Sequence, residues 1–283
     1  MKAIQIPYGK ETQTLHVADE QLQAVLTPRH PAAASLSQET LVRQALENPI
    51  GSLRLRELAR GKREILVITS DHTRPVPSRM TMPPLLAELR CGSPDAHIVI
   101  LIATGMHRPT TEAELRVKLG DAIVEREEIV VHQAEKTEEM AYFGLLPSGG
   151  ELWLNRLVAQ AELVVAEGFI EPHFFAGFSG GRKSILPGVA ARRTVLYNHN
   201  ARFLQSPLAR QGSLAGNPIH QDMLFAAQQA KLAFILNVLI DGDKRVIAAV
   251  AGDLEQAHAA GCALSRQLTE VAAVPAEIVV TSN

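Results

Sequence analysis

The feature that most constrains the fold is a series of short, continuous apolar runs rich in Val, Ile and Leu, with helix-like segments between several of them. The runs cover Glu64–Ser70, Ala96–Thr104, Glu128–His132, Glu162–Phe169, Leu232–Ile240, Val246–Gly252 and Glu277–Asn283. Apolar runs without polar alternation are typical of strands buried on both faces, as in a parallel sheet. Alternating strands and helices favour an α/β fold with right-handed crossovers.

The segments between these runs predict amphipathic helices. One is expected to begin at Ser78 and to be interrupted by Pro83 and Pro84. A second, TTEAELRVKLG, begins with Thr-x-x-Glu and ends at Gly120, which suits a cap at each end. Two more cover residues 217–230 and 253–272. Residues 1–35 differ, because they predict two short polar strands and a Pro/Ala-rich loop over residues 27–35.

Composition and charge exclude several classes of protein. The 283 residues carry a net charge of -2, and no basic stretch is interleaved with aromatic residues, so we expect no nucleic-acid partner. The N-terminus lacks the long apolar core of a signal peptide, and no apolar run is long enough to span a bilayer. The two cysteines, Cys91 and Cys262, predict neither a disulfide framework nor a thiolate metal site. We therefore expect a cytoplasmic protein without a membrane partner.

Polar residues follow three of the predicted strands directly. Asp71–Pro75 (DHTRP) follows the first strand, Gly105–Thr111 (GMHRPTT) the second, and IEPHFFAGFSGGRK follows Glu162–Phe169. Because sites in open α/β sheets gather at the carboxyl ends of the strands, we expect these three loops to converge.

The loop GFSGGRKS permits three interpretations. A phosphate-binding P-loop has Gly directly before its Lys, whereas Arg182 precedes Lys183 here, so the Walker pattern fails by one residue. A glycine-rich turn can still expose backbone N–H groups to an anion. The loop can also be a structural turn, or a ligand loop in which Lys183 is the reactive or charged group.

The histidines at the strand ends also have more than one interpretation. His173 lies among aromatic residues, where a histidine is often structural, and His107 can serve as a helix cap. Asp71 and Arg74 can be an ordinary solvated pair. Paired histidines also suit proton transfer near neutral pH, and a nearby arginine suits a carboxylate. With His199, several imidazoles favour a metal such as Ni, Cu, Fe or Zn, although no H-E-x-x-H spacing is present.

Several motifs together resemble the lactate racemase family, whose members carry a nickel-pincer nucleotide. The motifs are SDHTRPVPS, ATGMHRPTT, LPSGGELWLN, EGFIEPHFFAGFSGGRKSILPGVA, NHN, GNPIHQDMLFAAQQAKLAFILNVLID and AGDLEQAHAAGC. The resemblance covers nearly the whole chain from about Asn48. It implies a Rossmann-like N-terminal α/β domain over residues 1–270. It also implies that residues 271–283 form a last strand leading to a second domain that this chain lacks.

The resemblance further implies a cofactor site. The cofactor is a pyridinium 3,5-bisthiocarboxylic acid mononucleotide that binds nickel through two sulfurs and a ring carbon. Lys183 matches the lysine that bonds covalently to one arm, and His199 matches the imidazole that completes the nickel site. The other expected cofactor-binding residues are Asp71, Thr73, Arg74, Gly177, Ser179, Gly180, Gly181 and Arg182. Because the nucleotide needs dedicated biosynthesis proteins, a purified chain can lack it.

The function that the resemblance implies is an isomerase, a 2-hydroxyacid racemase or epimerase. A hydride moves from the substrate Cα to the cofactor and returns on the other face, while His107 and His173 act as acid and base. Arg74 orients the substrate, and Asp71 supports the arginine and histidine. The alternatives are a racemase of a 2-hydroxyacid other than lactate, and a nucleotide- or phosphate-binding module without chemistry, either of which can form oligomers.

Overall fold

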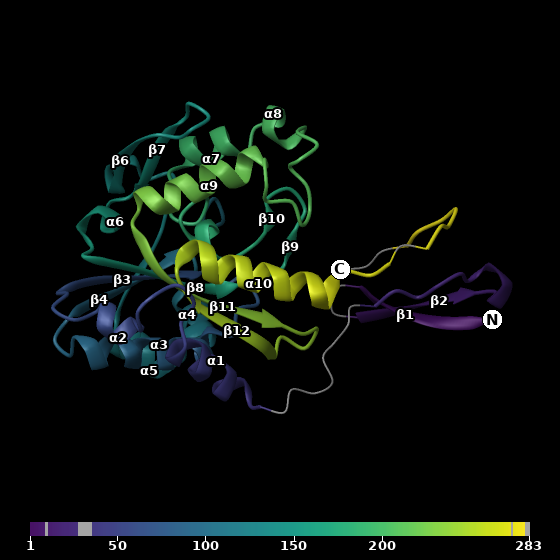
Figure 1. The fold of residues 1–283 in the computed structure, drawn as a ribbon, viewed down its shortest axis with the longest axis horizontal. Helices are drawn as coiled ribbons and strands as arrows, with labels where there is room; N and C mark the ends of the chain where they lie inside the picture. Colours follow the sequence, from purple (N-terminus) through teal and green to yellow (C-terminus); the bar gives the residue numbers. More distant parts are fainter. Residues whose placement is uncertain (9–10, 28–35, 273, 281–283) are drawn as a thin grey trace. The chain divides into compact units, whose positions relative to one another are not determined.

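The computed structural model describes residues 1–8, 11–27, 36–272 and 274–280 (Figure 1). Its contacts divide the chain into two compact units, one formed by Met1–His30 with Gln267–Asn283 and the other by Pro31–Arg266. Residues 1–30 thus belong to the first unit, whereas the family resemblance implied one domain over residues 1–270. The first unit contains the expected pair of short strands, an antiparallel hairpin of β1 (Lys2–Tyr8) and β2 (Glu11–Val17). Most of the loop predicted over residues 27–35 lies outside the described residues.

The main unit alternates strands and helices as expected. Its strands are β3 (Glu64–Ser70), β4 (His97–Ala103), β5 (Glu128–Val131), β6 (Met140–Leu145), β7 (Glu151–Asn155), β8 (Leu163–Phe169), β9 (Pro172–His173), β10 (Gly177–Phe178), β11 (Leu232–Ile240) and β12 (Val246–Gly252). Its α-helices are α1 (Gln38–Glu47), α2 (Leu55–Leu58), α3 (Ser78–Gly92), α4 (Glu112–Leu119), α5 (Asp121–Arg126), α6 (Arg156–Gln160), α7 (Arg192–Asn198), α8 (Ala201–Leu204), α9 (Pro218–Gln229) and α10 (Leu254–Thr269). Short 3-10 turns cover Asp19–Gln21, Thr137–Glu139 and Gly181–Ser184.

The central sheet has six strands in the order β12-β11-β8-β3-β4-β5. The five strands from β11 to β5 are parallel, which confirms the α/β fold, but β12 is antiparallel to β11. Asp241–Arg245 is all that separates β11 from β12, and the amide of Asp241 donates to the carbonyl of Arg245 at 3.0 Å. A connection this short makes a hairpin, because a parallel pair needs a crossover of a dozen or more residues.

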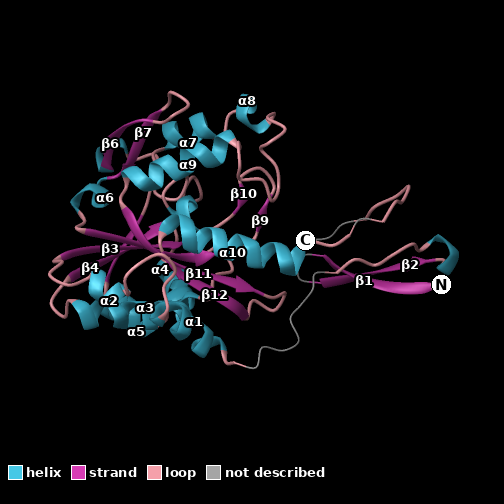
Figure 2. Cartoon of the chain, viewed as in Figure 1, coloured by secondary structure: helices cyan, strands magenta, loops and turns pink. Residues whose placement is uncertain are grey.

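Helices cover both faces of the sheet (Figure 2). Alternate residues of β3 divide between two apolar clusters: Ile65 and Val67 pack with α1–α5, and Leu66 and Ile68 pack with α6–α9. The two-residue period of a strand produces this division. The hairpin of β6 and β7, which the sequence analysis did not predict, joins the second layer through Leu152.

Two predicted helices show how local signals compete with packing. Helix α4 has both expected caps, because Thr111 and Glu114 form a capping box and Gly120 follows the helix with φ +88°. The prediction that Pro83 and Pro84 interrupt α3 is wrong, since the helix continues from Ser78 to Gly92. Its buried face includes Met82, Leu85, Leu86 and Leu89, and this packing outweighs the backbone hydrogen bonds that the prolines cannot donate.

The last predicted strand is not formed over its described part. Glu277–Val280 have no strand structure, and residues 281–283 lie outside the described residues. The side chains of Ile278, Val279 and Val280 are exposed. An apolar run forms a strand only when its backbone can form hydrogen bonds with a neighbouring strand. The apolar pattern alone was therefore not enough to predict a strand here.

Removing a core side chain from α3 should measure how much the helix layer stabilises the sheet. Leu85 is fully buried, so Leu85→Ala should lower the free energy of unfolding by about 2–5 kcal/mol. Leu53 is exposed, so Leu53→Ala should change it by less than about 0.5 kcal/mol. Urea unfolding followed by circular dichroism measures both, and equal losses would contradict the described packing.

Candidate functional site

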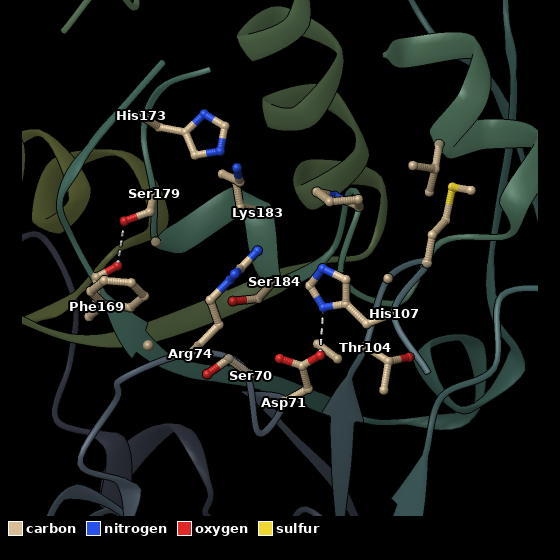
Figure 3. A pocket seen from close by; sticks show the side chains of 18 of the residues that line it. Ser70, Asp71, Arg74, Thr104, His107, Phe169, His173, Ser179, Lys183 and Ser184 are labelled. Atoms are coloured by element: carbon tan, nitrogen blue, oxygen red, sulfur yellow. Dashed lines mark hydrogen bonds and ion pairs between the residues drawn. The ribbon is translucent and has the colours of Figure 1, made fainter. Parts of the chain in front are cut away.

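A cavity of about 370 Å³ lies at the carboxyl ends of the parallel strands (Figure 3). The chain places β4 on one side of β3 and β8 on the other, so the strand order reverses beside β3. In open α/β sheets, this reversal opens a crevice between the loops that follow the adjacent strands. The loops after β3, β4 and β8 all line the cavity here, as the sequence predicted.

Most of the predicted site residues meet at this cavity. Those lining it are Asp71, Arg74, His107, His173, Ser179, Gly180, Lys183 and His199. Thr73, Gly177, Gly181 and Arg182 do not line it. Residues that line it without having been predicted include Thr104, Glu167, Phe175 and Ser184.

His107 is oriented by a buried carboxylate. Its Nδ1 lies 2.6 Å from Asp71 Oδ2, and Asp71 is 1% exposed. The other oxygen, Asp71 Oδ1, accepts from the Thr73 amide at 3.1 Å and from the Thr73 hydroxyl at 2.7 Å. A carboxylate at Nδ1 fixes the proton on that nitrogen, so in the neutral ring Nε2 keeps its lone pair. His107 is thus prepared to accept a proton at Nε2.

His173 has the opposite arrangement of protons. The Ala176 amide donates to His173 Nδ1 at 3.2 Å, so the neutral ring carries its proton on Nε2. Loss of solvent, followed by the charge of Lys183, lowers the pKa of His173 to about 3. His173 is therefore neutral at pH 7 and presents an N–H donor, whereas His107 presents an acceptor.

Phe175 is the centre of a cluster of aromatic rings beside His173. The centre of its ring lies 4.6 Å from the centre of the His173 ring and 5.0 Å from that of the His199 ring, and both pairs are edge to face. Lys183 Nζ lies 5.7 Å from the same ring centre. The Asn217 side chain, which also caps α9, donates to the Phe175 carbonyl at 2.8 Å. The pair of aromatic residues after His173 was the available signal for this cluster.

The amine of Lys183 lies in this half-buried setting without a hydrogen bond or ion pair to any described residue. The pKa of Lys183 is lowered to about 7, mainly by loss of solvent and then by the positive charges of Arg182 and Arg74. The carboxylate of Glu171 has a smaller effect in the opposite direction. More of this amine is therefore unprotonated at neutral pH than in an ordinary exposed lysine.

His199 supplies a third imidazole to the cavity. Its Nδ1 is buried and has no hydrogen-bond partner within the part of the chain that the structure describes. Loss of solvent and the charge of Lys183 lower the pKa of His199 to about 4, so the ring is neutral at pH 7. A neutral imidazole with an unused nitrogen is a good ligand for a transition metal. Among the described residues, no group of three His, Cys, Asp or Glu side chains could hold a metal ion.

Arg182 points away from the cavity, although the sequence analysis placed it among the cofactor contacts. The side chain is 1% exposed and donates to the carbonyls of Ala176 at 2.7 Å, Ser179 at 3.2 Å and Gly180 at 3.2 Å. Its Nε donates to His220 Nδ1 at 3.0 Å. Through these hydrogen bonds Arg182 stabilises the conformation of the glycine loop. Its position next to Lys183 in the sequence did not predict this structural role.

The glycines of the loop are needed for packing within the protein. Gly177 has φ +80°, and a Cβ there would lie 2.3 Å from the Ser213 carbonyl oxygen. Gly180 has φ +75°, and a Cβ there would lie 2.7 Å from Asn237 Oδ1. Asn237 also accepts from the Gly181 amide at 2.9 Å, so β11 holds the loop directly. Close approach to β11 and to Ser213 therefore explains Gly177 and Gly180 without a ligand.

A buried carboxylate forms part of the cavity lining. Glu167, in β8, is fully buried and accepts hydrogen bonds from the hydroxyls of Thr69, Ser78 and Thr81. Ser78 and Thr81 belong to the first turns of α3. Glu167 thus joins β8 to the start of the helix that follows the Asp71–Arg74 loop. One glutamate in an otherwise apolar strand was the sequence signal for it.

A family model and two relatives of known name all identify one protein family. A family model described as the lactate racemase N-terminal domain matches residues 8–212. The chain is 52% identical over its full length to a lactate racemase from Thermoanaerobacterium thermosaccharolyticum, and 50% identical to one from Lactiplantibacillus plantarum. The match covers 67% of each of these relatives. These findings confirm the resemblance noted from the motifs.

Two solved structures have a similar fold. The lactate racemase apoprotein from Thermoanaerobacterium thermosaccharolyticum superimposes with a TM-score of 0.90 at 52% identity, over 94% of this chain and 63% of that one. A protein from Thermotoga maritima superimposes with a TM-score of 0.64 at 24% identity, which shows a shared fold only. The chain therefore spans somewhat less than two thirds of the solved racemase. Within the described residues, no helix is both long and apolar enough to cross a membrane.

Histidine titration by NMR should separate His173 from an exposed histidine. His173 should stay neutral until pH approaches 3, whereas hydrogen bonds to Glu64 and Glu128 raise the pKa of His97 above 6.5. Because the unfolded chain protonates His173 near pH 6.5, it binds more protons than the native state between these pH values. Acidification through this window should therefore lower the free energy of unfolding. A His173 resonance that titrates near pH 6.5 would contradict the buried, neutral assignment.

Proposed function

This chain belongs to the lactate racemase family, and on that premise we propose that it carries the cofactor-binding and proton-transfer residues of a 2-hydroxyacid racemase. The observation that supports this most directly is the pairing of two imidazoles with different free nitrogens on one cavity. His107 offers an acceptor and His173 a donor, each held by a separate contact. Arg74 and Lys183 line the same cavity.

The substrate class follows from the charges around the cavity. Arg74 offers a planar guanidinium, which binds a carboxylate through two parallel hydrogen bonds. Figure 3 shows its head directed toward Lys183, between the sides occupied by His107 and His173. A carboxylate on Arg74 places the adjacent hydroxyl-bearing carbon of a 2-hydroxyacid near the imidazoles. Lactate, the substrate in the relatives' names, is the smallest chiral member of this class.

The residues present fit the nickel-pincer nucleotide. His199 is a neutral imidazole whose buried Nδ1 has no partner among the described residues, which suits a single metal ligand from the protein. Lys183 places an amine in the same cavity, which suits covalent attachment to the nucleotide. Of the remaining proposed contacts, Asp71, Arg74, Ser179 and Gly180 line the cavity, and Thr73 supports it through Asp71. When bound, the group supplies the acceptor and then the donor of the substrate's Cα hydride.

His107 takes the substrate hydroxyl proton at Nε2 in this mechanism. Asp71 stabilises the imidazolium that results, because its carboxylate already accepts the proton on Nδ1. Loss of that proton, with departure of the Cα hydrogen and its electron pair, leaves a planar 2-keto acid. Return of the hydrogen to either face, with return of the proton from His107, gives either enantiomer.

His173 contributes differently from His107. Its Nε2–H can donate to the substrate oxygen, and a neutral imidazole can polarise a carbonyl in this way. To act as a base at Nε2, it must move its proton to Nδ1, where the Ala176 amide now donates. The two histidines that the sequence treated as equivalent bases are thus unequal until the turn at Ala176 rearranges.

Expression in a host that makes the cofactor tests the proposal. Intact mass should show one adduct on Lys183, the protein should contain about one nickel per chain, and chiral chromatography should show conversion of D-lactate to L-lactate. Other chiral 2-hydroxyacids, assayed alongside, identify the preferred substrate. An unmodified, inactive chain that still binds a mononucleotide would instead support a binding module without chemistry.

Replacing the carboxylate that orients His107 should separate catalysis from binding. Asp71→Asn removes the fixed acceptor at Nδ1 and should lower kcat by about 10²- to 10⁴-fold. Nickel content and the Lys183 adduct should change less than kcat, because Asn keeps the size of Asp71 and neither attachment uses that proton. Thr73→Val removes one donor to Asp71 and should have a smaller effect. Full activity of Asp71→Asn would exclude His107 as the oriented base.

A further inference from the structure

Lys183 has the surroundings of a lysine that reacts with carbonyl compounds. Its amine lies in the 370 Å³ cavity, and no hydrogen bond or ion pair to it occurs within the described residues. The amine lies over the face of Phe175, with Nζ 5.7 Å from the ring centre. An amine without a carboxylate partner keeps its lone pair accessible, which is how lysines become nucleophiles.

The charges around the amine favour its neutral form. Arg182 and Arg74 are positive, His173 and His199 are neutral at pH 7, and Glu171 supplies the opposing negative charge. Burial has the largest effect, and the pKa of Lys183 falls to about 7. An ordinary exposed lysine is almost entirely protonated at that pH.

Arg74 selects which carbonyl compounds can approach. Its guanidinium lines the same cavity and is directed toward Lys183 in Figure 3. A 2-keto acid has a carboxylate for Arg74 on the carbon next to its ketone, so binding of one group brings the other toward Nζ. A ketone without a carboxylate lacks this orientation.

We propose that Lys183, when no cofactor is attached to it, condenses with 2-keto acids to form an imine. The Nζ lone pair attacks the ketone carbon, and the resulting carbinolamine loses its hydroxyl group as water. His107 Nε2 accepts the proton that leaves nitrogen, and the His107 imidazolium returns it to the departing hydroxyl. No oxidation or reduction occurs, and hydrolysis reverses the reaction.

This reaction depends on the cavity and not on the racemase activity. In the proposed function, a 2-keto acid forms midway through each turnover, at a site whose lysine is already bonded to the nucleotide. Covalent attachment would therefore also keep that lysine from trapping the keto acid. Imine formation can succeed or fail independently of racemisation, so the two proposals are separately testable.

Lys118 provides an internal control for burial alone. It is a buried lysine whose pKa is lowered by loss of solvent, but it does not line the cavity, and its Nζ lies 3.4 Å from Ser70 Oγ. If burial were sufficient, both lysines would react. If the cavity and Arg74 are needed, only Lys183 reacts.

The test uses the full chain from a host that does not make the nucleotide, with its unmodified mass verified first. Incubation with pyruvate and cyanoborohydride at pH 7 reduces any imine to a stable secondary amine, which peptide mapping locates. We expect one adduct at Lys183, none at Lys118, and none at either site in Lys183→Arg. Histidine NMR spectra verify that the variants remain folded.

A second variant tests the role of the carboxylate. Arg74→Gln should slow labelling by pyruvate about tenfold more than labelling by methyl pyruvate, because only pyruvate loses a charge-assisted pair, whereas the loss of a positive charge near Lys183 acts on both probes alike. Labelling spread over the surface lysines, or no preference for Lys183, would overturn the proposal. Equal slowing with both probes would overturn the part assigned to Arg74. Racemase activity without trapping at Lys183 would overturn this inference alone.

Discussion

The site depends on one buried guanidinium. Arg182 donates to three carbonyls of the turn that carries Lys183, and to His220 of α9, while it has no carboxylate partner among the described residues. Complete burial lowers even its pKa, to about 10. An unpaired charge is costly to bury unless each N–H is satisfied, so the loop is held where those carbonyls converge. The same positive charge acts on Lys183 from the opposite side of the loop.

The site residues that could be predicted from the sequence are those that directly follow a strand. Asp71, His107 and His173 each follow a buried parallel strand, and an α/β sheet brings such positions to one edge. The direction of a side chain within a loop could not be predicted. Arg182 and Lys183 are adjacent, yet one points beneath the loop and the other into the cavity. The positions of the groups that bind Arg182, which are fixed by tertiary packing, decide between them.

The fold, like the site, could be predicted from the sequence only in part. The apolar runs predicted β3, β11 and β12 to the residue, because a strand buried on both faces leaves a continuous signal. They did not predict the direction of β12, which the short connection after β11 decides, or the continuation of α3 through its prolines. The hairpin of β6 and β7 was not predicted because only one of its faces is buried. Glu277–Val280 has the same apolar signal without a neighbouring strand.

The turn that binds His173 links a proton to the main chain. His173 pairs with Gly177 across the short β9–β10 ladder, and the Ala176 amide between them is buried and donates to the imidazole. If Nδ1 gains a proton, that amide loses its acceptor in a place water does not reach, at a cost of about 1–3 kcal/mol. Protonation of Nδ1 would therefore destabilise the turn that joins β9 to β10. The protonation state of His173 and the conformation of this turn are thus thermodynamically linked.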